Sequence, residues 1–504
     1  QDMACDTFMK ISAKCKRMFV LVQASEARSF VEELVDGGVA ATIEDLEMHQ
    51  VHSFYEAVGY MVAAQPDPAA RASLLERLMG LPNGMWARRV AMAAEDVASL
   101  HDPEAEREMA RILRSNVCVC RSVGPSFGTQ MARIFLDMLN VYAAYATFIS
   151  GSVAEQGPQV LGYTVVKLAR NVKKEALELV QTFVERADPS TENVAELVDS
   201  FLPPFLDAVL SDFSESVPGA READVLSCLT AVVSKLRDAA AAPSVAPRIV
   251  EAVFDPVLGM ITENMNDHPE MRVGFYKLLE AVNLHAFGAL FDAPEERQNL
   301  VVDAVLWGVK HTKREIADVA LSLLSRLLDN VVATPELAQP FFQAHLMGIL
   351  QDVLFVLTDR MHKSGFKMQT AILRQLFTVV EAGHLSAPLW RDEDVGADAA
   401  GMTNSVYLRG CVSELIGNAF ENLSPAQVSA FVDGLCDVSR DVGDYKTLVR
   451  DFLIEILEFR ADENADLLYA EETAQEAEAA QQAELERQQA VPGLLGPADI
   501  DDDL

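Results

Sequence analysis

The chain has little positive charge. Its 504 residues include 41 Lys and Arg against 76 Asp and Glu, which gives a formal net charge of −35 at pH 7. A surface with this balance repels the phosphates of DNA and RNA, so we expect no direct contact with nucleic acid. An acidic surface instead favours basic protein partners, although solubility alone would also explain it.

Long apolar runs and targeting signals are also missing. The longest purely apolar stretches fall well below the roughly 18 residues that a membrane span needs, so we expect no membrane contact. No signal peptide is visible at the start. Because the sequence begins with Gln1 inside an apparent helix, we expect it to be a fragment of a longer protein.

Cysteines and histidines are too scattered to predict a metal site. The seven cysteines include one close pair, Cys118 and Cys120, with no second pair or flanking histidine, which is typical of reduced core cysteines. His49 and His52 could share a helix face but lack the HExxH spacing and a third ligand. Phosphate loops of the GxxxxGK[ST] type are absent. We therefore expect no cofactor and no enzymatic activity.

Helical periodicity dominates what the sequence contains. Apolar residues recur at i, i+3, i+4 and i+7 in stripes such as 131–145, 250–261 and 316–328. Each stripe predicts one buried face of an amphipathic helix. No convincing alternation with a period of two is found, so the predicted fold class is all-α.

The helical segments recur in pairs. Roughly 20 segments of about 15–25 residues form pairs that repeat about every 40–50 residues, a period typical of HEAT or armadillo repeats. One antiparallel pair cannot bury both faces alone, so neighbouring pairs must stack. We predict a HEAT-repeat α-solenoid over residues 1–460, with a large non-repeating helical bundle as the alternative. Breakers containing proline or glycine separate the segments at 65–66, 81–84, 124–125, 217–219 and 268–269.

Two regions depart from this pattern. Leu385 to Asn404 carries Gly, Pro and acidic residues and predicts a long loop between helices. The tail, Ala461 to Leu504, holds thirteen Asp or Glu and one basic residue, Arg487. Its middle is rich in Ala, Glu and Gln, which favours a marginal helix, and its last stretch is predicted to be flexible.

Several dense strings resemble the exportins, the nuclear export receptors of the importin-β/karyopherin family. They follow the family's order and cover nearly the whole chain, and they correspond to its C-terminal part. The strings are QDMACDTF at 1–8, HSFYEAVGYM at 52–61, LDMLNVY at 136–142, PPFLDAVL at 203–210, VPGARE at 217–222, AVNLH at 281–285, Trp307, KHT at 310–312, RDFL at 450–453 and VPG at 491–493.

The resemblance implies a function as well as a fold. The family's receptors bind leucine-rich nuclear export signals together with Ran-GTP, contact nucleoporins, and shuttle between nucleus and cytoplasm through the nuclear pore. The part of the family that supplies most of the signal groove and the main Ran surface precedes the residues matched here. A HEAT-repeat scaffold subunit of some other complex is the alternative function.

The resemblance also marks two residues near the start. Met3 matches a methionine at the far end of the family's signal groove, where apolar anchors of a bound peptide insert between helices. Lys10 lies seven residues later, hence on the same helix face, and could steer acidic residues that flank a signal. A core methionine and an ordinary solvated lysine are the plain alternatives.

Two basic clusters stand out in this acidic chain. One consists of Arg170, Lys173 and Lys174, and the other lies between Lys310 and Arg314, with His311 and Lys313. Each could contact an acidic patch of a partner or form salt bridges between repeats. The tail carries a further hypothesis from the resemblance, in which it favours a closed groove when Ran is absent.

Overall fold

The structure is a computed structural model. It describes residues 2–458 except 25, 38, 189–196, 237–241, 263–266, 360–361, 363–364 and 391–401. Every regular element within the described residues is a helix, and none is a strand. The chain divides into two compact units, Gln1–Val301 and Val302–Leu504. The predicted all-α fold of helical repeats is confirmed.

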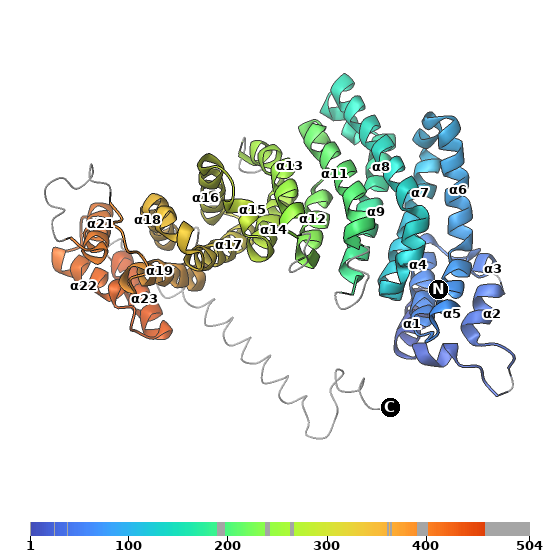
Figure 1. Cartoon of the computed structure of the whole chain (residues 1–504), viewed down its shortest axis with the longest axis horizontal. Helices are drawn as coiled ribbons and strands as arrows, with labels where there is room; N and C mark the ends of the chain where they lie inside the picture. The colour runs from blue at the N-terminus through green and yellow to red at the C-terminus, as the bar shows by residue number, and fades with distance from the viewer. Residues whose placement is uncertain are drawn as a thin grey trace. The chain divides into compact units, whose positions relative to one another are not determined.

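The first unit has two layers of helices. The first layer contains α1 (Asp2–Lys14), α4 (Met48–Ala63), α7 (Pro103–Val123), α9 (Thr164–Arg186), α12 (Ala223–Leu236) and α14 (Pro269–His285). The second contains α2 (Phe30–Asp36), α3 (Val39–Ile43), α5 (Pro68–Leu78), α6 (Gly80–Glu95), α8 (Gly128–Gln156), α11 (Leu202–Glu215), α13 (Ala242–Thr262) and α15 (Gly288–Phe291). Figure 1 shows the two layers most clearly where α8, α11 and α13 lie above α9, α12 and α14. Most helices pack against the next one in their own layer and against a helix of the other layer, as α7 does with α9 and α6.

The second unit has the same two-layer plan. One layer contains α17 (Arg314–Val332), α19 (Phe366–Glu381) and α23 (Val442–Glu458). The other contains α18 (Pro335–Thr358), α21 (Asn404–Ala419) and α22 (Pro425–Cys436). The boundary between the units falls within α16 (Glu295–Val309).

The apolar stripes of the sequence form the core between the layers. In α8 all six stripe residues from Met131 to Tyr145 are buried, and in α17 the stripe from Ile316 to Leu328 is buried except for Val319, which is half-buried. Burial of one Leu, Ile or Phe side chain contributes about 1.5–3 kcal/mol. Since each helix buries residues against two or three neighbours, the repeats stabilise one another.

Two details of the repeat differ from expectation. In the middle of the first unit, the starts of successive first-layer helices lie farther apart along the chain than the expected 40–50 residues. The reason is that α8 has 29 residues and α9 has 23.

The breaker predicted at 81–84 is wrong, since these residues form the first turn of α6. Pro82 is tolerated there because the first-turn amides of a helix have no partner within it.

The two irregular regions are only partly described. In the loop predicted at 385–404, the described residues 385–390 and 402–403 are not helical, and α21 starts at Asn404. The Asn404 amide donates to the carbonyl oxygen of Ala387 (2.9 Å). Trp390 packs on Tyr407 at 5.4 Å between ring centroids. Residues 391–401 and the predicted tail, 461–504, lie outside the described residues.

Two helical stretches have the length and composition to cross a membrane. They are Pro103–Gln156, which joins α7 to α8, and Pro335–Thr358, which is α18. Half of each apolar window is buried inside the protein, in the packing between helices. Core helices of soluble proteins pass the same test, so these stretches are weak evidence for a membrane span, and the absence of membrane contact stays a prediction.

Glu106 is an unusual member of this core. It is fully buried in α7, and neither carboxylate oxygen has a hydrogen-bond partner among the described residues. Burial raises the pKa of Glu106 to about 7; the charge of Asp102 adds to this shift and that of Arg107 opposes it. The folded unit therefore favours the protonated acid.

The first prediction concerns the pH dependence of this unit. The ordinary pKa of Glu106 is 4.5. Because the folded state holds the proton more tightly, stability should fall as the pH rises from about 4.5 to about 7. Glu106→Gln should remove this slope and stabilise the unit at pH 8 by about 1–3 kcal/mol in urea unfolding. Glu104→Gln, an exposed change on the same helix, is the control, and an unchanged slope in Glu106→Gln would contradict the assignment.

Candidate protein-binding surface

Helix α1 has one packed face and one open face. Phe8 stacks on Phe54 of α4 at 6.3 Å between ring centroids. The carboxylate of Asp2 accepts hydrogen bonds from the Gln50 amide and the His49 ring, both at 2.7 Å. The Gln50 hydrogen bond, helped by the one from His49, lowers the pKa of Asp2. These contacts fix which face of α1 remains open.

Met3 and Lys10 both lie on the open face. The side chain of Met3 is 83% exposed, Lys10 is exposed, and Ile11 beside it is 46% exposed. Met3 therefore does not pack in the core of the described residues. The roles of Met3 and Lys10 in binding a signal stay predictions.

The open face continues into a basic segment that the sequence analysis did not single out. Lys10, Lys14, Lys16 and Arg17 are all exposed, and none makes an ion pair within the described part of the chain. Three exposed apolar side chains follow directly, Met18, Leu21 and Val22. A count of charge in short windows would have found this segment, since four cations within eight residues are unusual in so acidic a chain.

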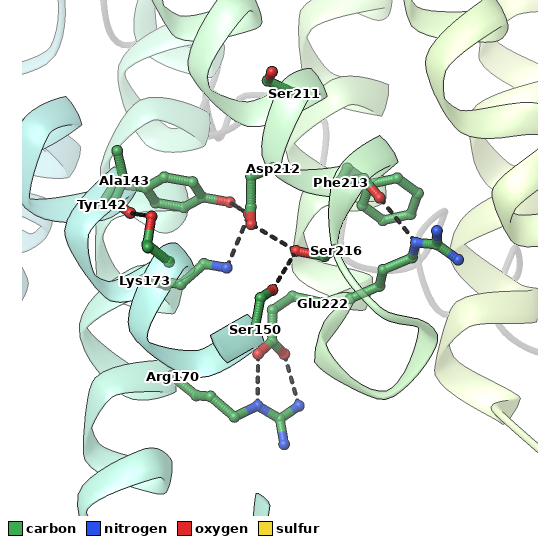
Figure 2. A network of polar contacts seen from close by, with 12 residues as sticks. Tyr142, Ala143, Ser150, Arg170, Lys173, Ser211, Asp212, Phe213, Ser216 and Glu222 are labelled. Carbon is green, nitrogen blue, oxygen red and sulfur yellow. Dashed lines mark hydrogen bonds and ion pairs between the residues drawn. The ribbon is translucent and has the colours of Figure 1, made fainter. Parts of the chain in front are cut away.

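The cluster of Arg170, Lys173 and Lys174 joins α9 to its neighbours, and Figure 2 shows the contacts of Arg170 and Lys173. The Arg170 guanidinium donates two hydrogen bonds to the carboxylate of Glu222, at 2.5 and 2.8 Å. Lys174 pairs with Asp224 of α12 at 3.1 Å. All three cations therefore have acidic partners on the following elements.

Lys173 is the most deeply placed of the three. It is 1% exposed, and its Nζ donates to the Oδ2 of Asp212 in α11 at 2.8 Å. The hydroxyl of Tyr142 donates to the same oxygen at 2.7 Å, and Ser216 donates to Oδ1 at 2.9 Å. Burial and the charge of Asp212 raise the pKa of Tyr142. Figure 2 shows these contacts meeting at one carboxylate.

For Lys173, this network decides between contact with a partner and a salt bridge between repeats. A buried ammonium cannot reach a partner, so Lys173 acts as a salt bridge between α9 and α11. Arg170 is one third exposed and Lys174 about half exposed, so contact with a partner stays a prediction for these two alone.

The second cluster, from Lys310 to Arg314, also contains members engaged within the protein and members that are exposed. Lys310 pairs with Asp352 of α18 at 2.8 Å, and its carbonyl oxygen accepts a hydrogen bond from the ring of His362 at 2.9 Å. His311 is buried and its Nδ1 accepts from the backbone amide of Lys313 at 3.0 Å. Among the described residues Arg314 pairs within its own helix, with Asp318 at 3.3 Å, and it stays 56% exposed. Arg314 and the exposed Lys313 therefore remain accessible to a partner, and their contact with one stays a prediction.

The cysteines and other ligand types give no metal site in the described ranges. No three His, Cys, Asp or Glu side chains come together as ligands there. Burial raises the pKa of Cys118 to about 12 and also raises the pKa of Cys120, so both thiols stay protonated. The cysteine residues in the described structure are free thiols.

The second prediction tests the buried network. Asp212→Ala should destabilise the first unit by about 3–5 kcal/mol in urea unfolding, because the Lys173 charge would lose its buried partner. Asp224→Ala is the matched control, since its pair with Lys174 is partly exposed and should contribute less than about 1 kcal/mol. Equal effects of the two substitutions would contradict the importance given to the buried pair.

Comparison with known proteins gives consistent matches along the whole chain. The family model described as CRM1 C terminal matches residues 130–461. Protein EXPORTIN 1B of Arabidopsis thaliana is 41% identical over 100% of the chain, and Exportin-1 of Schizosaccharomyces pombe is 39% identical over 99%. Exportin-1 of Drosophila melanogaster is 38% identical over 100%. The chain spans 45–46% of the length of these three relatives.

Proposed function

Because the chain belongs to the exportin-1 family, we propose that it is the C-terminal part of a nuclear export receptor. In this proposal the whole protein binds leucine-rich export signals cooperatively with Ran-GTP. It carries protein and ribonucleoprotein cargo from nucleus to cytoplasm, contacts nucleoporins at the pore, and shuttles between the two compartments. The protein binds and carries its cargo without catalysing a reaction.

The open face of α1 is the observation that carries the proposal. An export signal presents apolar anchors at helical spacing, which fit a groove between two helices. Met3 and Ile11 offer exposed apolar contacts, and methionine adapts to anchors of different shapes. The second wall of such a groove would come from a helix upstream of α1.

The basic segment of α1 supports the same proposal. Lys10 and Lys14 lie on or beside the open face, and Lys16 and Arg17 follow. Unpaired cations attract acidic residues that flank an apolar signal and raise its rate of association. Because the chain as a whole is acidic, this segment is one of the few places where acidic ligands would be attracted.

The third prediction concerns Met3. In a longer protein that includes residues upstream of Gln1, Met3→Ala should weaken binding of a leucine-rich signal peptide by about tenfold, because it removes part of one apolar contact. Fluorescence anisotropy of a labelled signal peptide would measure this. Met92→Ala, which alters a 43% exposed methionine in α6, is the control and should leave the affinity unchanged.

The fourth prediction separates an export receptor from a scaffold. In the same longer protein, Ran-GTP should raise the affinity for the signal peptide, with a coupling of about 1–3 kcal/mol, and Ran-GDP should not. A HEAT-repeat scaffold subunit of another complex would show no dependence on the nucleotide. Affinity that is equal with Ran-GTP and Ran-GDP would therefore refute the proposed function.

A further inference from the structure

Helix α1 is attached to α4 at two places, one on each flank of its packed face. Successive side chains of an α-helix are turned by about 100°, so Asp2 and Phe8 point about 120° apart. The buried side chain of Ser12 lies between these two directions. Since Asp2 bonds to Gln50 and Phe8 stacks on Phe54, the two contacts together fix the rotation of α1 about its own axis.

The direction of Met3 follows from this rotation. Met3 is turned by about 100° from Asp2, on the side away from Phe8. It is one residue from Asp2 and five from Phe8, so its placement depends most directly on the attachment at Asp2. The exposed residues of α1 that share its direction are Met3, Thr7, Lys10 and Lys14.

The attachment at Asp2 is built around a buried amide. Gln50 of α4 is 3% exposed. Its Oε1 accepts a hydrogen bond from the backbone amide of Glu47 at 3.0 Å, in the capping box that begins α4. This bond fixes the orientation of the side-chain amide. The Nε2 of Gln50 therefore faces α1, where it donates to the Oδ1 of Asp2 at 2.7 Å.

Position 2 must therefore provide a hydrogen-bond acceptor. Without one, the buried Nε2 of Gln50 would lose its partner among the described residues, and a buried donor without a partner is costly. The Nε2 of His49 lies 2.7 Å from the same Oδ1. Since the Asp2 and His49 side chains are 75% and 61% exposed, the pair between them contributes little, and the buried Gln50 makes the contact important.

Asp6 shows what an unattached acid looks like on the same helix. It lies one turn after Asp2 and is exposed. It makes no hydrogen bond or ion pair within the part of the chain that the structure describes. Asp6 therefore shares the charge and the helix of Asp2 but not its contact with α4.

We propose that Asp2 is a positioning residue for the signal-binding face of α1. Its carboxylate, held by Gln50 and His49, sets the direction of Met3. In this role Asp2 acts through Met3 and need not contact the signal itself. The inference rests on the proposed function, because it assigns Asp2 a part in binding an export signal.

The attachment can be measured without a signal. In the chain itself, Asp2→Ala should speed amide hydrogen exchange at Thr7 and Phe8 about tenfold, because their amides bond to carbonyl oxygens of the first turn. Asp2→Asn keeps an acceptor oxygen and should exchange like the unmodified chain, as should Asp6→Ala. Equal exchange in all these chains would show that Asp2 does not hold the first turn, and the proposal would fall.

The effect on binding is measured in a longer protein that includes residues upstream of Gln1. With a labelled, leucine-rich signal peptide that has acidic flanks, Asp2→Ala should weaken binding about fivefold in fluorescence anisotropy, and Asp2→Asn should not. Loss of a negative charge alone would act in the opposite direction, since an acidic peptide would be repelled less. Asp6→Ala measures this charge effect.

The double variant Asp2→Ala/Met3→Ala separates positioning from a general loss of stability. If Asp2 acts through Met3, the combined fold-change should be smaller than the product of the two single fold-changes. A combined change equal to that product would overturn the proposal. If Met3→Ala weakens binding and Asp2→Ala does not, only the inference about Asp2 fails. If Met3→Ala itself has no effect, the signal does not bind this face, and the proposed use of the α1 face fails with it.

Discussion

The structure depends on the fact that one pair of helices cannot bury its apolar residues alone. Helix α7, for example, buries residues against α4 on one side, α9 on the other and α6 across the layers. Each further pair adds burial for its neighbours, so stability grows by nearest-neighbour contact. A long chain can in this way remain stable without a single large core, and its helix surfaces stay available for binding.

The second constraint is the acidic composition. The chain has only 41 Lys and Arg for 76 Asp and Glu, so Lys and Arg are scarce. Many of these cations form ion pairs between helices. Arg114 and Arg121 of α7 both pair with Glu178 of α9, and Arg297 pairs with Asp255 of α13. The pair of Lys173 with Asp212 is buried, and it specifies how α9 and α11 meet because an unpaired charge there would be costly.

The sequence predicted what depends on local periodicity. The stripes at 131–145 and 316–328 have the helical period, so their burial could be foreseen. The prediction of a break at 81–84 was wrong because proline and glycine are also compatible with a first helical turn. The residues alone do not distinguish a break between helices from the first turn of a helix. Lys173 was ambiguous for another reason: its partner lies 39 residues away, and only the stacking of helices brings the two together.

The few cations without an acidic partner then become informative. In a chain with excess carboxylates, most Lys and Arg side chains can find one, so an unpaired cation marks a place where the fold leaves room for an acid from elsewhere. The α1 segment from Lys10 to Arg17 meets this condition within the described residues, and the exposed apolar side chains of Met18, Leu21 and Val22 lie beside it. The α1 face therefore offers both charge and apolar surface to a separate ligand.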